Sequence, residues 1–418
     1  MNPRHRPLLR DAAPVALRRL GLALCCAAAL CPAAWAQSSP YYIGVSQSFA
    51  HDSNLIRLRD GQAAPAGFSK SDTISSTGLV AGVDQTFGRQ RLSGSGALRA
   101  NRYSNNSDFD SQSYSANLDL AWQTIERLSG NLTLGADRAL RADLRDRNDQ
   151  FIATDNNETS RRFGATVSLG VAGPLGLEAG YSRSDVSYSA PEAAFNDYEQ
   201  SSASAGIRWR LGGSSSVGLG VRQTRTDYPQ LLVGLADPSD RRKRDDIDLN
   251  GTWVPSGASR FDLRLSRGKT KHDRFTQRDF TGNTGALAWS YTPGGRTRLN
   301  ARLSRESGQD ATRATTASSQ ITESLSLSAD YEVSAKVMAM ASLQNYRRTL
   351  DGSGQFQTSV RGRDRGTLWS LGARWQALRG LTLACQAGRE ERSTNSSPLL
   401  NDPFSASSYS CSGQFVLQ

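Results

Sequence analysis

Cysteine, histidine and long apolar runs are scarce in this chain of 418 residues, and each scarcity excludes a class of protein. Beyond the first 36 residues only Cys385, Cys411, His51 and His272 remain of the five cysteines and three histidines, too few ligands for a zinc site, although Asp and Glu alone could still hold calcium. The mean hydropathy is -0.50, and no mature stretch approaches the roughly 20 apolar residues of a spanning helix. A helical membrane protein is therefore excluded. A β-barrel is not, because its strands give only every second residue to lipid.

The N-terminus has the plan of a secretory signal peptide. Its positive region is followed by a short apolar core from Leu20 to Leu30, and Ala34-Trp35-Ala36 supplies small residues for the peptidase. We expect residues 1–36 to be cleaved, leaving 37–418 as the mature barrel. Lipidation is disfavoured, because Cys25 and Cys31 follow leucines where a lipobox needs a small residue.

Removal of that segment takes away five arginines and Asp11, so the net charge falls from +11 to +7. The remaining basic excess is spread along the chain, without a basic run interleaved with aromatics. Nucleic acid is therefore not an expected partner.

The main signal in the mature chain is a period of two. From Tyr114 to Trp122 the even positions are apolar and most odd positions polar, and the same alternation, with apolar odd positions, recurs at 162–171, 202–211 and 324–333. A soluble sandwich also alternates, but its inner face is large and apolar. Here the second face carries Arg, Asp, Glu, Ser and Gly, which is typical of a watery lumen.

Turn residues then give the topology. Short connections are predicted at Gly88-Arg89, Glu126-Arg127, Gly173-Pro174, Gly212-Gly213, Ser256-Gly257, Gly294-Gly295, Ala335-Lys336 and Arg379-Gly380. Longer polar loops are predicted at 142–158, 229–242, 304–319, 351–363 and 394–405. Eight short turns and two terminal strands predict an all-β, transmembrane, antiparallel up-and-down β-barrel of about 18 strands in the bacterial outer membrane.

Aromatic residues on the outward register of their strands lie near the short turns, which predicts a girdle at the periplasmic interface: Trp122, Trp209, Trp253, Trp289, Tyr291, Tyr331 and Trp375. Near the other ends of the strands, Arg102, Arg267 and Arg389 share the outward parity. We expect those arginines to meet lipid phosphates, so that outer-membrane lipid and lipopolysaccharide are expected partners.

The inward register of the strands defines candidate pore-lining residues: Arg162, Arg208, Arg210, Arg222, Arg264, Arg298, Arg302, Arg374, Asp119, Asp246, Asp248 and Asp330. Arg99, Asp137, Glu178, Asp262 and Glu332 share it. For any single residue the alternative is a cross-strand pair that braces the wall, such as Asp248 with Arg264. As a set they predict an anion-preferring interior, and joint charge reversal of Arg208, Arg210 and Arg222 is expected to weaken that preference without unfolding the barrel.

The last two predicted strands hold the only two mature cysteines. Cys385 and Cys411 share the outward parity, so a disulfide is possible in an oxidising compartment, but a shifted register would leave them a diagonal apart. Phe415, three residues before the end, is the expected recognition aromatic for the barrel-assembly machinery. An outer-membrane hydrolase is disfavoured, because neither His51 nor His272 lies in a catalytic motif, and no enzyme is expected.

The segment from Tyr42 to Asp60 resembles the start of the EpsL-type outer-membrane barrels of exopolysaccharide operons. Asp52, Asn54, Leu55 and Arg57 match an Asp-x-Asn-Leu-aromatic-Arg motif, while Ile56 stands in place of the aromatic. Read from the residues alone, Asp52 and Asn54 are Asx-turn residues that end the first strand.

The resemblance implies a channel for exopolysaccharide biosynthesis and export, with an anionic polysaccharide and envelope export proteins as partners. The alternative is a general porin for small solutes, or a structural outer-membrane protein without a transport role. The sequence leaves both open.

Overall fold

The computed structural model describes residues 39–124, 127–141, 151–152, 156–170, 174–212, 214–230, 239–274, 279–310, 317–353, 359–394 and 403–418. Pro40–Gln418 forms one compact unit. The predicted signal peptide, residues 1–36, lies outside the described residues. No helix in the described part of the chain is long and apolar enough to cross a membrane.

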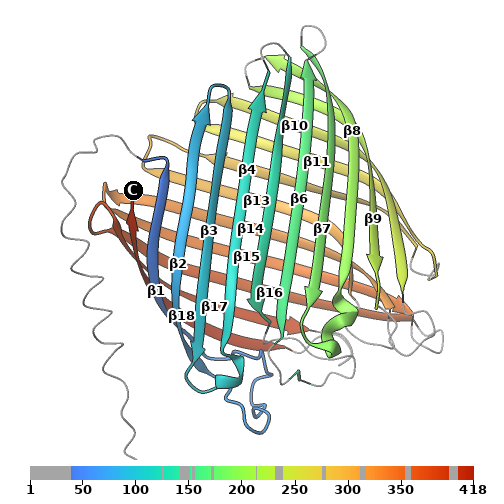
Figure 1. Cartoon of the computed structure of the whole chain (residues 1–418). Coiled ribbons are helices and arrows are strands. Elements are labelled where there is room, and N and C mark those ends of the chain that lie inside the picture. The colour runs from blue at the N-terminus through green and yellow to red at the C-terminus, as the bar shows by residue number, and fades with distance from the viewer. Residues whose placement is uncertain are drawn as a thin grey trace, which may run out of the picture. The chain divides into compact units, whose positions relative to one another are not determined.

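Eighteen antiparallel strands form a single sheet, and β1 pairs with both β2 and β18, which closes the sheet into a barrel (Figure 1). The first nine are β1 (Tyr41–Asp52), β2 (Asp72–Phe87), β3 (Gln90–Tyr103), β4 (Ser111–Gln123), β5 (Leu128–Leu140), β6 (Asn157–Gly170), β7 (Leu175–Tyr188), β8 (Tyr198–Gly212) and β9 (Ser215–Tyr228). The others are β10 (Asp240–Ser256), β11 (Ser259–His272), β12 (Phe280–Tyr291), β13 (Thr297–Asp310), β14 (Ala317–Ser334), β15 (Val337–Ser353), β16 (Ser359–Gln376), β17 (Leu381–Thr394) and β18 (Phe404–Leu417). The predicted 18-stranded up-and-down barrel is confirmed.

The two parities of each strand face opposite sides of this wall. Large apolar side chains of the predicted lipid parity are exposed, among them Ile207 at 56%, Leu219 at 61% and Leu371 at 58%. Opposed strands keep them together, because Ile207 pairs directly with Leu219. In water so much exposed apolar surface would cost solvation free energy, whereas hydrocarbon accommodates it.

Of the predicted short turns, Gly88-Arg89, Gly294-Gly295, Ala335-Lys336 and Arg379-Gly380 lie between consecutive strands, and Ser256-Gly257 begins at the last residue of β10. In the other three turns, Glu126, Gly173 and Gly213 lie outside the described residues. Gly294 and Gly295 in the turn after β12 have φ of 63° and 82°, a conformation that favours glycine. The predicted loops 304–319 and 351–363 were too long, because β13 continues to Asp310 and β16 begins at Ser359. Beyond the membrane both faces of a strand meet water, so a polar segment can remain in the ladder. There Arg305 forms an ion pair with Glu323 across β13 and β14.

Aromatic side chains form a continuous row on the outer face at the short-turn end. Trp253, Phe261 and Trp289 are direct neighbours across β10, β11 and β12, and their rings stack at centroid distances of 5.2 and 6.2 Å. Tyr291 extends the row at 5.4 Å from Trp289. Such rings suit the membrane interface, where one edge is apolar and the other is wet.

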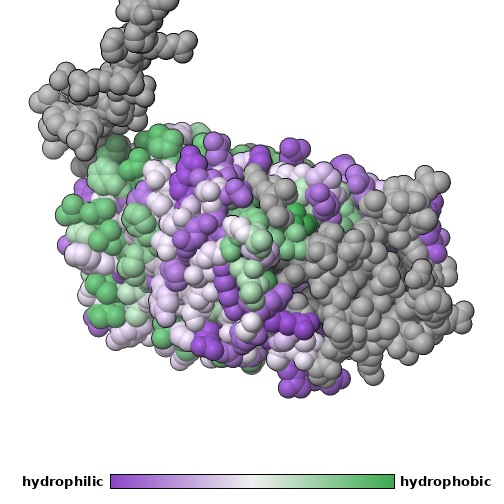
Figure 2. All heavy atoms as spheres, turned by 90° about the horizontal axis from the view of Figure 1, so that it is seen from below, coloured by the Kyte–Doolittle hydropathy of each residue, from purple (hydrophilic) through white to green (hydrophobic). Residues whose placement is uncertain are grey.

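A small hydrophobic core lies at the long-loop end of the barrel. Ile56 and Leu58, from the loop between β1 and β2, pack with Phe109 of the short helix η1 (Ser107–Phe109), and all three are at most 1% exposed. A second cluster joins Ile152 to Ala193 of η2 (Pro191–Asn196). The view from below shows hydrophobic residues gathered mainly on one side of the described surface, with hydrophilic residues beside them (Figure 2). The two clusters pack described residues of different loops against one another at the rim.

Candidate channel lumen

The inner face of β7 to β12 is lined by small residues. Gly180, Gly206, Gly220 and Ala288 occupy inward positions there and border a cavity of about 590 Å³. Because these positions carry no long side chains, space is left beside the wall. The lining residues of this cavity come from strands only, and longer charged side chains project among them, including Glu178, Arg208, Arg222, Asp248, Arg264 and Arg302.

Most predicted pore-lining arginines have an acidic partner on the same inner face. Arg208 pairs with Glu178 at 2.7 Å, Arg298 with Glu332 at 3.2 Å, and Arg162 with Asp137. Arg264 and Arg302 both approach Glu306, each at 3.8 Å. Glu306 was predicted to lie in a loop, so its place on the inner wall was missed. The signal that could have shown it is its spacing of four residues from Arg302, which puts both side chains on the same face of one strand.

The most buried of these ion pairs lies on β9 and β10. Arg222 is 3.1 Å from Asp248 and 3.4 Å from Asp246, and Arg244 is 2.7 Å from Asp246. The Asp246 side chain is only 1% exposed, so its charge is balanced by two guanidinium groups rather than by water. Gly268 lies directly opposite Asp246, and a Cβ there would be 2.0 Å from its carboxylate oxygen. The glycine makes room for this cluster.

The suggested ion pair between Asp248 and Arg264 does not form, because each residue has a different partner. The register places Asp248 opposite Ser266 and Arg264 opposite Asn250. Asp248 therefore turns to Arg222 on the other neighbouring strand. Arg244, which sequence reasoning did not name, shares the parity of Asp246 and completes the cluster.

Three inward arginines, Arg99, Arg210 and Arg374, form no ion pair with any residue that the structure describes. Of the predicted acids, Asp119 accepts a hydrogen bond from Asn131 at 3.0 Å, and Asp330 lies opposite Arg298 in the register. Among these predicted residues three arginines and two aspartates thus lack an ion pair with a described residue, which leaves a small positive excess on the inner face.

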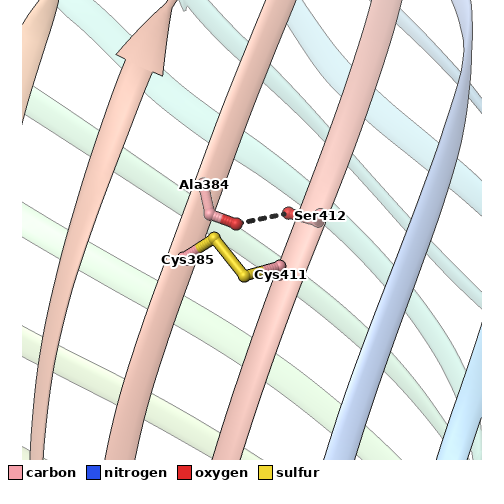
Figure 3. The surroundings of a disulfide bond; sticks show 4 residues. All are labelled: Ala384, Cys385, Cys411 and Ser412. Carbon is pink, nitrogen blue, oxygen red and sulfur yellow. Dashed lines mark hydrogen bonds between the residues drawn. A yellow bond between two sulfur atoms is a disulfide. The ribbon is translucent and has the colours of Figure 1, made fainter.

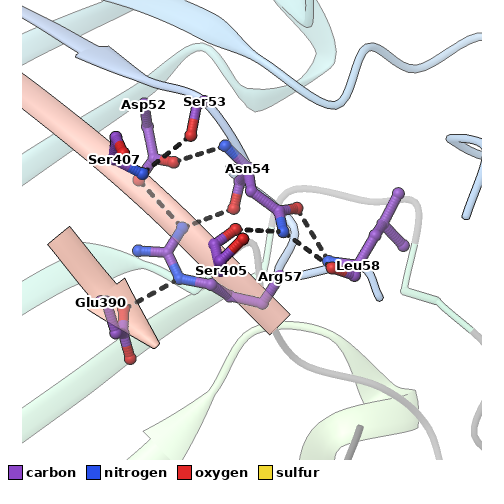
Figure 4. A network of polar contacts seen from close by, with 8 residues as sticks. All are labelled: Asp52, Ser53, Asn54, Arg57, Leu58, Glu390, Ser405 and Ser407. Carbon is purple, nitrogen blue, oxygen red and sulfur yellow. Dashed lines mark hydrogen bonds and ion pairs between the residues drawn. The ribbon is translucent and has the colours of Figure 1, made fainter. Parts of the chain in front are cut away.

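The family-motif residues lie at the rim, where the chain leaves β1 beside β18 (Figure 4). Asp52 accepts a hydrogen bond from the N–H of Asn54 at 2.8 Å, which is the geometry of an Asx turn. The Asn54 side chain donates to the carbonyls of Leu58 and Ser405 and accepts from the N–H of Leu58. Leu55 packs against the loop core.

Arg57 completes this network and has an unusual backbone. Its guanidinium contacts Asp52 at 2.9 Å and Glu390 of β17 at 3.1 Å. Its φ of 53° is the only positive value of a non-glycine residue in the described chain, and costs about 1 kcal/mol. Because Arg57 contacts Glu390 of β17 and Asn54 bonds to Ser405 of β18, the motif ties the end of β1 to the last two strands and strengthens the closure of the barrel.

The disulfide between Cys385 and Cys411 lies on the outer face of β17 and β18, with a Cα–Cα distance of 4.1 Å (Figure 3). The diagonal arrangement considered from the sequence does not occur, because the two residues are direct partners in the register. Phe415, on the same face, pairs with Val45 and Leu381. Its role in assembly stays a prediction.

No protein-family model matches the chain, and no curated protein matches it. The exopolysaccharide-operon resemblance thus has no support beyond its own residues. Among solved structures, the chain is similar to OccK2 (OpdF) of Pseudomonas aeruginosa, at 15% identity over 90% of this chain and 98% of that chain, with a TM-score of 0.48.

The outer membrane protein OpdK of the same bacterium is 12% identical over 90% and 99%, with a TM-score of 0.45. The ferric enterobactin receptor PfeA, also from Pseudomonas aeruginosa, is 9% identical over 91% and 82%, with a TM-score of 0.44.

Closure of all 18 strands, an exposed apolar outer face and a row of interfacial aromatics define the class of this protein. It is a β-barrel of the bacterial outer membrane.

Proposed function

We propose that the barrel is a passive channel for small hydrophilic solutes, a porin in the general sense. The observation that carries the proposal is the inner cavity bordered by glycine, alanine and serine positions of β7 to β12 and by paired charges. Barrels of about 18 strands are wide enough to leave an aqueous path once the wall side chains are in place. Alternating fixed charges let a polar solute exchange contacts without being held.

We further propose a preference for anions. The inner carboxylates are mostly neutralised by arginines, whereas Arg99, Arg210 and Arg374 have no acidic partner among the described residues. A mobile anion meets these arginines without having to break an existing ion pair.

The test is solute entry into liposomes that contain the purified barrel, with uncharged sugars of increasing size. Ala288→Trp, which fills an inward position of the cavity, is expected to reduce entry of the larger sugars. The matched control is Ala301→Trp, on the lipid-facing register opposite Trp289. Entry is measured as the rate of liposome swelling, and equal rates for the two variants would contradict the proposal. If the natural barrel admits no solute, a structural role remains.

The finer proposal, suggested by the resemblance at Asp52, Asn54, Leu55 and Arg57, is passage of an anionic exopolysaccharide together with envelope export proteins. It is the second candidate, because the polar residues of this motif already have contacts that hold the rim and so give no information on cargo. A deletion strain separates the two. Loss of surface polymer with polymer retained in the envelope supports export, whereas normal surface polymer contradicts it and leaves the solute channel.

A further inference from the structure

Two arginines on the outer face of the wall have no polar partner among the residues that the structure describes. Arg347 of β15 and Arg365 of β16 lie directly opposite each other in the register, and neither makes an ion pair or hydrogen bond with any described residue. Like charges in directly opposed positions destabilise a sheet. A pair of this kind is compatible with a stable wall where an anion lies between the two side chains.

The acids nearest to this pair are already engaged. Glu323, directly opposite Arg347, forms an ion pair with Arg305, and Glu391 is 2.6 Å from Arg389. Asp60, at the edge of the same site, accepts a hydrogen bond from Ser405 at 2.9 Å. None of these three carboxylates forms an ion pair with Arg347 or Arg365, although Glu323 and Asp60 lie close enough to offset part of their charge.

Their height on the wall corresponds to the outer headgroup layer. On the outer face of β16 the residues are apolar from Trp375 to Trp369 and polar from Thr367 to Arg365. Arg365 is ten residues from Trp375 of the aromatic end, or roughly 33 Å along the strand. With the usual tilt of about 40° this is about 25 Å across the membrane, the height of the apolar band.

A groove lies beside the two arginines. It has a volume of about 670 Å³, and its lining includes Leu303 and Leu325 on the lipid-facing register as well as Asn345 and Thr367. The apolar side chains suit an acyl chain, and the guanidinium groups above them suit a phosphate, which arginine binds in a bidentate geometry.

We propose that Arg347 and Arg365 bind a phosphate group of a phosphorylated glycolipid of the outer leaflet, the lipid A moiety of lipopolysaccharide. Of the three arginines expected from the sequence to meet lipid phosphates, Arg102 pairs with Asp110 and Arg389 with Glu391. Arg267 has no ion pair with a described residue, and its contact with lipid stays a prediction. The register adds what the sequence pattern missed, namely two arginines in directly opposed positions on β15 and β16. This assignment does not depend on what the lumen transports.

The experiment is native mass spectrometry of the full barrel in detergent with EDTA, so that no divalent cation can link a phosphate to Asp60, Glu323 or Glu391. The probes are diphosphorylated lipid A, the same glycolipid without phosphates, and phosphatidylglycerol. The test variant is Arg347→Gln with Arg365→Gln. The control is Arg183→Gln with Arg241→Gln, two outward arginines that have acidic partners and lie far from the groove.

The test variant is expected to bind diphosphorylated lipid A roughly tenfold more weakly, or worse, because two charge-assisted contacts are lost. The control should bind it within about twofold of the natural chain, and the phosphate-free glycolipid should bind weakly to all three. Equal losses in the two double variants would overturn the proposal. So would an equal loss for phosphatidylglycerol, since the site would then take any phosphate headgroup. Folding of each variant is checked by heat-modifiable gel mobility.

Discussion

Cys385 and Cys411 are direct partners across β17 and β18, and the bond between their sulfurs faces the lipid side of the wall. It joins the last two strands at a sequence separation of 26. A crosslink of that span lowers the entropy of the unfolded chain and is worth about 3 to 4 kcal/mol. Since β18 also pairs with β1, the disulfide restrains the strand that closes the barrel.

We expect the denatured, unreduced protein to migrate faster on a gel than the reduced protein, and to resist thiol labelling until a reductant is added. Cys385→Ser with Cys411→Ser should still form a barrel but unfold at lower urea concentration. Complete labelling of the natural chain without reductant would show that the bond does not form in the cell.

The contacts of Asn54 predict a strong effect at the rim. This side chain is fully buried and bonds both to its own loop and to β18, so Asn54→Ala leaves several polar groups without partners. We expect a loss of about 3 kcal/mol in the free energy of unfolding, measured by urea titration in micelles. Asn105→Ala, which removes one exposed hydrogen bond, should change it by about 0.5 kcal/mol or less. Similar values for the two variants would refute the assigned role of Asn54.

Gly268 provides a steric test of the inner cluster. A methyl group there would meet Asp246 at 2.0 Å and Arg244 at 2.8 Å, so Gly268→Ala must displace that ion pair. We expect a loss of about 2 kcal/mol in stability and an altered single-channel conductance. Gly176→Ala, also on the inner face, meets its nearest atom at 3.4 Å and serves as the control. An unchanged conductance in the Gly268 variant would show that Asp246 and Arg244 lie outside the ion path.

The loop between β3 and β4 should open in acid. Asp110 accepts a hydrogen bond from the N–H of Tyr103 at 2.8 Å and pairs with Arg102, and these contacts lower the pKa of Asp110 below its ordinary 3.8. The stabilisation is present above the ordinary pKa and is lost as the pH falls through the lowered folded value. Hydrogen exchange of residues 104–109, corrected for intrinsic rates, should speed up in that window. In Asp110→Asn the loop should already exchange faster at neutral pH, and a retained acid response in this variant would assign the effect to another group.

The strand number, the turns and the two faces of the wall were predictable because a period of two survives in every strand, as at Ile207 and Leu219. The strand ends beyond the membrane could not be predicted, because both faces of a strand meet water there and the alternation of polar and apolar residues is lost, as at Arg305 and Glu306. Pair partners such as Arg222 with Asp248 depend on the stagger between neighbouring strands. Parity shows which face a residue occupies, but it does not show which residue lies opposite.

Loop contacts were still less accessible to sequence reasoning. Ile56 and Phe109 have no periodic pattern around them, yet they are buried against each other because two loops meet at the rim. The unpartnered pair Arg347 and Arg365 could be found only once the register between β15 and β16 was known.

Two arginines on the inner face, Arg210 and Arg222, should respond differently to charge reversal. Arg210 has no acidic partner among the described residues, whereas Arg222 lies between Asp246 and Asp248, whose side chains are 1% and 10% exposed. Reversing Arg210 should therefore shift selectivity with little loss of stability. Reversing Arg222 would place three carboxylates together in a buried setting, at a cost of about 3 to 5 kcal/mol.

We thus expect Arg210→Glu to move the reversal potential of a planar bilayer toward cations while urea unfolding stays near that of the natural chain. Arg222→Glu should unfold at clearly lower urea concentration, so the joint reversal of Arg208, Arg210 and Arg222 is not expected to leave the barrel intact. Arg208→Gln, which frees Glu178, is the intermediate case and should weaken anion preference with a modest loss of stability. If Arg210→Glu leaves the reversal potential unchanged, the unpaired arginines do not set the selectivity of the lumen, and the anion preference has to be abandoned.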